Sequence, residues 1–371
     1  MSRPIHARLD WAALRHNHAI VRRHVGSAQV WSVIKANAYG HGLLPAALAL
    51  QGTTDGFALI ELDGAIALRE AGIRQPILLL EGFYQPDELP LFAEWELTPV
   101  LHAPWQVEAL ITARLPVRLP VYLKLDTGMH RLGLTAGEFA QALARLEAAD
   151  CTSAITVMTH FADADEERGI AEQMRRLRDI TAGLTLPLSL ANSAALLRFP
   201  ESHADWVRPG IMLYGASPFP LRQSAEELGL KPVMTLVSEL IGVRDLKAGD
   251  RVGYGGTFVA EQPMRIGIVA CGYADGYPRH APTGTPVLVA GQRTRTLGRV
   301  SMDKLCVDLT ALEVNGVKVM RSGIHSDGAG DTVVLWGEGL PADDVATAAG
   351  TVAYELFCAI TPRVPLIEVN P

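Results

Sequence analysis

Short apolar runs alternate with longer amphipathic segments through roughly the first 210 residues of the chain. The apolar runs are rich in β-branched residues and are bounded by turn formers, which is typical of buried strands. The segments between them carry apolar residues at helical spacing. The predicted strands are Trp31–Ile34, Gly56–Ile60, Ile77–Leu80, Thr98–Leu101, Val121–Leu125, Ile155–Thr159, Leu188–Ala191 and Trp206–Val207. The predicted helices are Trp11–His24, Leu44–Leu50, Gly64–Ala71, Pro86–Glu94, Pro104–Thr112, Ala136–Ala148 and Arg168–Ala182.

This alternation predicts an α/β fold with an N-terminal (β/α)8 barrel of the TIM type, a fold that typically takes about 250 residues. A doubly wound sheet is the rival, but the GxGxxG fingerprint is missing after the first strand. Several predicted strands end on a polar or ionisable residue, and a barrel places its active site at those ends. These residues are Lys35, Glu61, Glu81, His102, Asp126, His160, Asn192 and Arg208.

The pattern changes after about Pro220, where short β-rich runs separated by Gly-Asp and Pro-Thr-Gly turns predict an all-β domain. We therefore expect a barrel domain over residues 1–225 and a C-terminal β domain over residues 226–371. The segment Val314–Gly330 is predicted to be a loop insertion, and a closing helix is predicted over Pro341–Ala359. The expected strands are Met234–Val243, Arg265–Cys271, Thr285–Val289, Arg293–Leu297, Leu305–Leu309 and Thr332–Leu335.

Composition narrows the class of protein. With 371 residues, 49% of them hydrophobic and 20% charged, the chain suits a globular protein of two domains. A net charge of -7 argues against nucleic acid or an anionic membrane as the main partner. No apolar run reaches transmembrane length, and the first residues lack the apolar core of a signal peptide. The four cysteines form no CxxC pair, so we expect no metal site and a cytoplasmic location.

Lys35 is the first candidate for chemistry. A lysine at the end of a buried strand is partly dehydrated, which lowers its pKa and frees the amine as a nucleophile or base. Tyr39 and the turn Gly40-His41-Gly42 could hold an anion beside it, as a phosphorylated cofactor requires. The alternative is a surface lysine just past a strand.

A set of eight motifs, in order from about residue 5 to the C-terminus, resembles the alanine racemase family. This resemblance implies a pyridoxal phosphate enzyme of fold type III. It also implies a barrel followed by a β domain, and a homodimer whose active sites are built from both chains. The motifs are Val33–Gly42, Lys124–Gly133, Thr159–Ala162, Ala191–Ala194, Val207–Ile211, Gly253–Gly255, Gly272–Tyr277 and Ser301–Asp303.

The resemblance implies a racemase in which two bases act on a pyridoxal phosphate aldimine. Lys35 resembles the lysine that bonds the cofactor and serves as the base on the D side. Tyr254, from the partner subunit, resembles the base that takes the α-proton of L-alanine. A free tyrosine has a pKa near 10, so it needs nearby help, for which His160 and Arg208 are candidates. Arg208 would donate to the pyridine nitrogen without protonating it.

The remaining roles also follow from the resemblance. Lys124 aligns with a lysine that is often carbamylated and that positions Arg131. The substrate carboxylate would be bound by Arg131 and the Met302 amide, with Asp303 beside them and Tyr273 at the entrance. The cofactor contacts would be Lys35, Tyr39, His160, Asn192, Ser193, Arg208, Gly210, Ile211 and Tyr354.

Three alternatives stay open beside an alanine racemase that supplies D-alanine for peptidoglycan or takes part in alanine catabolism. A broader-specificity racemase would share the motifs, because side-chain selectivity depends on the shape of the pocket. A non-catalytic protein that binds pyridoxal phosphate would need neither a β domain nor Tyr254. A decarboxylase on the same plan is disfavoured by the Arg208 context and by the absence of a glycine-rich phosphate motif.

Overall fold

The computed structural model describes residues 3–312 and 332–370, and the chain divides into two compact units. One unit comprises residues 15–213 and 221–223; the other comprises the described residues among 1–14, 214–220 and 224–371. The predicted loop Val314–Gly330 lies outside the described residues. Across the described part of the chain, no helix has the length and apolar character needed to cross a bilayer.

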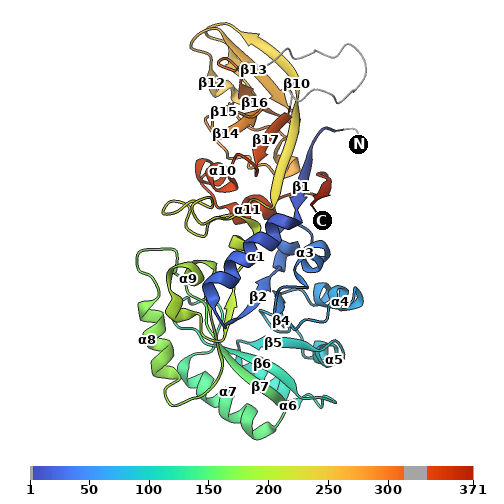
Figure 1. Ribbon diagram of the computed structural model, residues 1–371, viewed down its shortest axis with the longest axis vertical. Coiled ribbons are helices and arrows are strands. Elements are labelled where there is room, and N and C mark those ends of the chain that lie inside the picture. The colour runs from blue at the N-terminus through green and yellow to red at the C-terminus, as the bar shows by residue number, and fades with distance from the viewer. Residues whose placement is uncertain (1–2, 313–331, 371) are drawn as a thin grey trace. The chain divides into compact units, whose positions relative to one another are not determined.

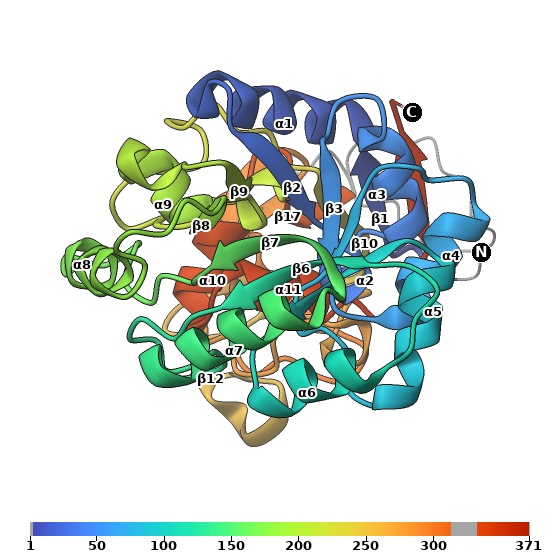
Figure 2. The same ribbon diagram turned by 90° about the horizontal axis from the view of Figure 1, so that it is seen from below.

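The first unit is built on eight parallel strands that close into a barrel, which Figure 2 shows with helices around it. The ring closes where Val30 pairs with Val207. At this seam Trp31 stacks on Trp206 with ring centroids 4.3 Å apart. The barrel confirms the predicted fold class and excludes the open sheet. Its strands are β2 (Gln29–Val33), β3 (Gly56–Leu59), β4 (Ile77–Leu79), β5 (Leu97–Leu101), β6 (Leu119–Lys124), β7 (Thr152–Met158), β8 (Leu188–Asn192) and β9 (Trp206–Arg208).

The predicted helices between the barrel strands are found close to their expected positions, whereas the short segments Lys35–Tyr39 and Ser193–Arg198 were not predicted. For example, α7 begins at a capping box in which Thr135 and Glu138 bind each other's backbone N–H groups. The helices are α1 (Trp11–Val25), α2 (Lys35–Tyr39), α3 (Leu43–Leu50), α4 (Leu62–Glu70), α5 (Leu89–Glu94), α6 (Pro104–Thr112), α7 (Ala136–Ala149), α8 (Ala171–Ile180) and α9 (Ser193–Arg198). Short 3-10 turns are η1 (Pro86–Glu88), η2 (Pro200–Ser202) and η3 (Ile211–Tyr214).

The second unit contains a mostly antiparallel sheet in the order β13-β16-β15-β14-β17-β10-β1-β18, which confirms the predicted all-β domain. Its long strand β10, drawn in yellow in Figure 1, also pairs with β13 beyond an irregularity between Leu240 and Gly242. The strands are β1 (His6–Asp10), β10 (Met234–Leu246), β13 (Met264–Val269), β14 (Pro286–Val289), β15 (Gln292–Leu297), β16 (Leu305–Asp308), β17 (Thr332–Trp336) and β18 (Leu366–Val369). A separate pair consists of β11 (Arg251–Val252) and β12 (Phe258–Val259).

Two features of this unit differ from the sequence-based expectation. Residues 6–10 were expected in the barrel domain, but β1 lies in the sheet of the second unit, between β10 and β18. Its alternating burial suits a sheet with one covered face. The predicted helix over Pro341–Ala359 was wrong as a single helix. It is divided into α10 (Ala342–Ala349) and α11 (Ala353–Cys358), because Gly350 adopts a left-handed conformation with a φ of 73°.

Candidate active site

Four ionisable residues lie at the carboxyl ends of barrel strands. Lys35 follows β2, Lys124 is the last residue of β6, His160 follows β7, and Arg208 is the last residue of β9. Parallel strands of one barrel direct these ends to the same mouth, where barrels place their active sites.

Arg208 is held by two residues of the neighbouring strand β8 and by Thr159, which directly follows β7. Its Nη1 donates to Ser189 Oγ at 2.8 Å, and its Nη2 donates to the carbonyl oxygens of Thr159 and Leu190 at 2.7 and 3.1 Å. Burial lowers the pKa of Arg208 to about 10, so the guanidinium is still protonated at neutral pH. Within the described residues its Nε–H has no hydrogen-bond partner. This side chain therefore offers one fixed donor to an acceptor at the mouth of the barrel.

His160 is a neutral imidazole. Its Nδ1 accepts from Arg208 Nη2 at 3.4 Å, which assigns the ring proton to Nε2. Burial holds the pKa of His160 well below its ordinary value, and the charges of Arg208, Lys124 and Arg131 lower it further. The ring can consequently donate from Nε2 to a further acceptor without becoming charged.

Lys124 and Arg131 form a pair of neighbouring cations. Burial lowers the pKa of Lys124 to about 8, and the charges of Arg208 and Arg131 lower it further, whereas Glu81 opposes the shift. Arg131 is exposed, and it forms no hydrogen bond or ion pair with any residue in the described ranges. Because the charge of Arg131 lowers the pKa of Lys124, the two groups repel each other, and an anion between them would relieve this repulsion.

The segment after Lys35 is a left-handed turn. Ala36, Asn37, Ala38 and Tyr39 have φ angles of 53°, 53°, 52° and 52°. This conformation costs about 1–2 kcal/mol for each residue other than glycine, and only asparagine adopts it with ease. Strain of this kind persists only where the surrounding structure enforces it, and it gathers at functional sites. Asn37 is the one residue of this turn whose type favours the left-handed conformation.

Tyr39, Ser193 and Gly210 meet in a small cradle. The Gly210 N–H donates to Ser193 Oγ at 2.9 Å. A Cβ atom at Gly210 would lie 2.4 Å from the Tyr39 hydroxyl oxygen, so only glycine leaves room for that hydroxyl. Ser193 begins α9, whose N-cap Asn192 accepts the Ala195 N–H, and Ile211 begins η3 directly after Gly210. Two hydroxyls beside backbone N–H groups suit a phosphate.

In the second unit, the predicted substrate residues Tyr273 and Met302 are close together. The Tyr273 N–H donates to Ser301 O, and the Ala274 N–H donates to Met302 O, both at 3.0 Å. Tyr254, in the 3-10 turn η4 (Tyr254–Gly256), is 73% exposed, and Met302 is 52% exposed. Tyr354 lies in α11 and is also exposed.

A buried carboxylate supports this second group. Asp275 is fully buried and accepts from Arg3 at 2.6 and 3.0 Å, and Arg363 Nε lies 3.2 Å from it. Arg363 also donates to Asp303 at 2.6 Å, and this hydrogen bond lowers the pKa of Asp303. Sequence reasoning missed the two arginines, because nothing in the local pattern relates the two ends of the chain to residue 275.

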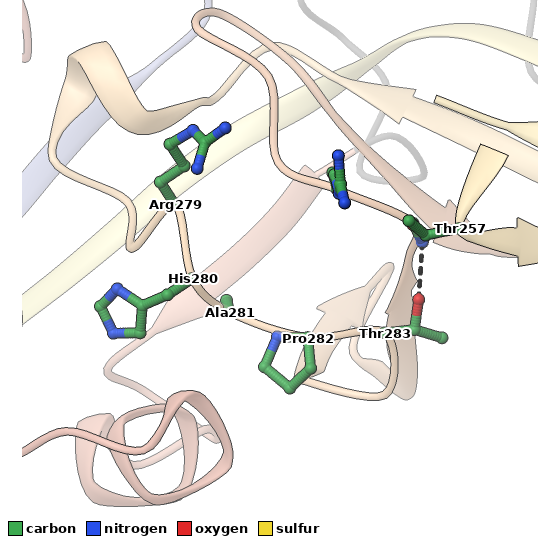
Figure 3. Close-up of a pocket in the computed structure, with 8 residues that line it drawn as sticks. Thr257, Arg279, His280, Ala281, Pro282 and Thr283 are labelled. Carbon is green, nitrogen blue, oxygen red and sulfur yellow. Dashed lines mark hydrogen bonds between the residues drawn. The ribbon is translucent and has the colours of Figure 1, made fainter. Parts of the chain in front are cut away.

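A pocket of about 480 Å3 in the second unit is lined by residues 279–283 and by Thr257, Gly298 and Arg299 (Figure 3). Arg279 and Arg299 line it, and neither guanidinium forms a hydrogen bond or ion pair within the described part of the chain. Arg279 lies 6.0 Å from the ring centroid of Tyr273, and the Arg299 Nη1 lies 3.2 Å from the position of a Cβ at Gly255. The two cations give the cavity a positive lining near both predicted tyrosines.

The structure therefore groups the predicted residues in two sets, one in each unit. The barrel unit carries Lys35, Lys124, the cradle, and the side chains of Arg131, His160 and Arg208. The second unit carries Tyr254, Tyr273, Met302, Asp303 and Tyr354.

Both units match known protein domains. Residues 9–218 match the N-terminal domain of alanine racemase, and residues 233–368 match its C-terminal domain. The chain is 56% identical to the alanine racemase of Nitrosospira multiformis, over 98% of this chain and 99% of that protein. It is 52% identical to the catabolic alanine racemase of Salmonella typhimurium over 99% of each chain.

Solved structures agree with these matches. The biosynthetic alanine racemase from Pseudomonas aeruginosa superposes with a TM-score of 0.92 at 44% identity, over 99% of each chain. The alanine racemase from Bartonella henselae, which was solved with covalently bound pyridoxal phosphate, superposes with a TM-score of 0.85 at 27% identity, over 99% of each chain.

Proposed function

The chain belongs to the alanine racemase family, and we propose that it interconverts L-alanine and D-alanine with Lys35 and Tyr254 as its two bases. Members of this family are pyridoxal phosphate enzymes. When bound, the cofactor supplies an electron sink that makes the α-proton of the amino acid acidic. The protein must then bind both ligands, hold a base on each face of the substrate, and keep the proton at Cα.

The observation that carries the proposal is the phosphate cradle beside the catalytic lysine. Tyr39 and Ser193 present hydroxyls to it, and Gly210 and Ile211 begin the turn beneath it. Tyr354 would complete the phosphate contacts, and Asn192 caps the helix that begins with Ser193. Lys35 would bond covalently to the carbonyl carbon of the cofactor. These groups fit pyridoxal phosphate in both charge and hydrogen-bonding capacity.

Arg208 decides where the proton returns. Its guanidinium stays charged at neutral pH and can donate a hydrogen bond to the ring nitrogen of the cofactor, but it will not release a proton to that nitrogen. An unprotonated pyridine draws less negative charge into the ring. Protonation at Cα of the substrate is thereby favoured over protonation on the cofactor, which favours racemisation over transamination.

Tyr254 would act on the face of the substrate opposite Lys35. A phenol with a pKa near 10 works as a base at neutral pH only when its anion is stabilised. The tautomer of His160 leaves an Nε2–H that can donate to such a phenolate, and Arg208 keeps this tautomer in place. The neutral charge of His160 also keeps it from protonating the tyrosine outright.

The substrate carboxylate would be bound by Arg131 and the Met302 amide. Lys124 would position Arg131 as a carbamate, because an amine with a pKa of about 8 is mostly protonated at neutral pH and would repel the guanidinium. Asp303 and Tyr273 would border the entrance. We propose that Tyr254, Tyr273, Met302 and Asp303 reach the site from a second copy of the chain, in a homodimer with shared sites.

The relatives span both physiological roles, since one is called biosynthetic and another catabolic. D-alanine supply for peptidoglycan and alanine catabolism are therefore both compatible with the proposal. We propose that the enzyme is cytoplasmic, where cysteines that form no disulfide would stay reduced.

The deciding experiment incubates the pyridoxal phosphate-loaded protein with L-alanine in heavy water and follows D-alanine and Cα deuterium together. We expect D-alanine that carries deuterium at Cα. Cofactor binding without D-alanine would favour a non-catalytic binding protein, and ethylamine would favour a decarboxylase. Turnover of larger amino acids at comparable rates would favour a broader racemase.

A shared site is tested by mixing two inactive proteins, Lys35→Ala and Tyr254→Phe. Hybrid dimers would contain one site with both bases, so we expect part of the activity to return. Complete failure, with subunit exchange verified by mass, would exclude the shared site.

A further inference from the structure

The left-handed turn Ala36–Tyr39 joins two side chains that act on opposite ends of one ligand in the proposed function. Lys35 would hold the carbonyl carbon, and Tyr39 would hold the phosphate. The two residues are four positions apart, and the turn between them is closed by backbone hydrogen bonds from the Ala38 N–H to Ile34 O at 2.9 Å and from the Gly40 N–H to Ala36 O at 3.0 Å. The spacing of the two anchors is consequently set by the conformation of this turn.

His41 closes the end of the turn from inside the protein. Its side chain is fully buried, and Nδ1 lies 3.1 Å from Ala38 O and 2.9 Å from Tyr39 O. Carbonyl oxygens only accept hydrogen bonds, so Nδ1 carries the proton and donates to both. The Ala38 carbonyl also accepts the backbone N–H of His41 at 3.0 Å, and the imidazole adds a side-chain donor that it shares between the Ala38 and Tyr39 carbonyls.

We propose that His41 is a positioning residue: its Nδ1–H holds the left-handed turn that sets Lys35 and Tyr39 at the spacing that pyridoxal phosphate requires. The inference rests on the proposed function, because it takes from it the roles of the two anchors. It adds a residue that touches neither the cofactor nor the substrate.

The turn needs such a clamp because its own residues disfavour it. Three of the four lack the tolerance of asparagine for this conformation. Two exposed side chains also bind the turn: Glu61 accepts from the Ala36 N–H at 3.3 Å, and Asn37 accepts from the Leu43 N–H at 2.8 Å. His41 is the buried member of the set, and a hydrogen bond away from water is stronger than one in contact with it.

Two substitutions separate positioning from packing. In His41→Asn, the amide nitrogen lies about where Nδ1 was, so the donor is kept. In His41→Gln, the amide group lies one bond further out and the donor is moved away, while the volume is closer to that of histidine. Packing alone would therefore favour the glutamine variant, whereas positioning favours the asparagine variant.

The readouts are the Kd for pyridoxal phosphate, the rate of covalent attachment at Lys35 (trapped by borohydride and located by peptide mass), and the unfolding midpoint of the cofactor-free protein. We expect His41→Gln to weaken the Kd and slow attachment about tenfold, the effect of losing one effective hydrogen bond. His41→Asn should stay within about threefold of wild type on both, and the two variants should unfold at similar temperatures.

Wild-type affinity and attachment in His41→Gln would overturn the inference. So would a loss in both variants that follows the unfolding midpoint, because the histidine would then only support the fold. Both results would leave the racemase assignment intact. If the wild-type protein itself neither bound pyridoxal phosphate nor racemised alanine, that result would refute the proposed function, and with it the inference about His41.

Discussion

A single methyl group at Gly210 tests the phosphate cradle directly. In Gly210→Ala the new Cβ would lie 2.4 Å from the Tyr39 hydroxyl oxygen and 3.2 Å from Tyr39 Cζ. Ordinary contacts begin at 3.4 Å, so the hydroxyl must move by about 1 Å. Gly210 is not among the residues with positive φ, so alanine fits its backbone without strain. The substitution therefore acts on the tyrosine alone.

The expected magnitude follows from the bond that is lost. A hydrogen bond to a charged group contributes about 1.5–3 kcal/mol, which corresponds to a weakening of about 10- to 150-fold. We expect the Kd of the cofactor-free protein for pyridoxal phosphate to rise by a factor in this range, with a smaller change in the free energy of unfolding. Fluorescence titration measures the first quantity, and urea denaturation measures the second.

Two comparisons make this result decisive. Gly137→Ala in α7 has open space around its new methyl group and should leave the Kd unchanged. In a Tyr39→Phe background the clashing oxygen is already gone, so Gly210→Ala should add much less than it does alone. A Kd for Gly210→Ala within about threefold of wild type would refute the cradle.

Three further predictions concern charge. In carbon dioxide-free protein, Lys124 should make the free energy of unfolding rise by roughly 3 kcal/mol in total between about pH 8 and about pH 10.5. Over this range the unfolded chain keeps a proton that the folded chain has released. Lys124→Met should flatten this rise, and equal denaturation curves across pH in both proteins would contradict the prediction. Asp275→Asn should lower the free energy of unfolding by about 1–3 kcal/mol, since its arginine partners are partly exposed, and should raise the KM for alanine. The control is Glu338→Gln, which breaks an exposed ion pair and should change both quantities little. Tyr254→Phe should slow Cα exchange mainly from L-alanine, and equal slowing from both enantiomers would argue against a one-sided base.

The barrel could be predicted from the sequence because its elements are locally determined. Each strand is a short apolar run between turn formers, and the predicted helix Pro104–Thr112 has the same bounds as α6. The strand ends that carry Lys35, His160 and Arg208 followed from the same pattern. Their roles came from the resemblance to a family, and the site assignments stay predictions until the variants are measured.

Long-range pairing accounts for what the sequence did not reveal. β1 has a clear two-residue alternation, but its partners β10 and β18 are more than two hundred residues away along the chain. The ion pair between Arg3 and Asp275 likewise joins residues 272 positions apart along the chain. The left-handed turn after Lys35 is the extreme case, because the conformational preferences of its alanine and tyrosine residues disfavour left-handed backbone angles.

The electrostatics of the barrel mouth explain why these parts belong together. Lys35, Arg131 and Arg208 each lower the pKa of Lys124, and Glu81 is the acidic neighbour that opposes them. A group of cations with so little compensation is unfavourable in a partly buried site. A phosphate at the cradle and a carboxylate at Arg131 would each bring negative charge to this group. The cations that help to keep His160 neutral would then bind both ligands. Their mutual repulsion destabilises the ligand-free protein, and the negative charge of the ligands would relieve it and so strengthen binding.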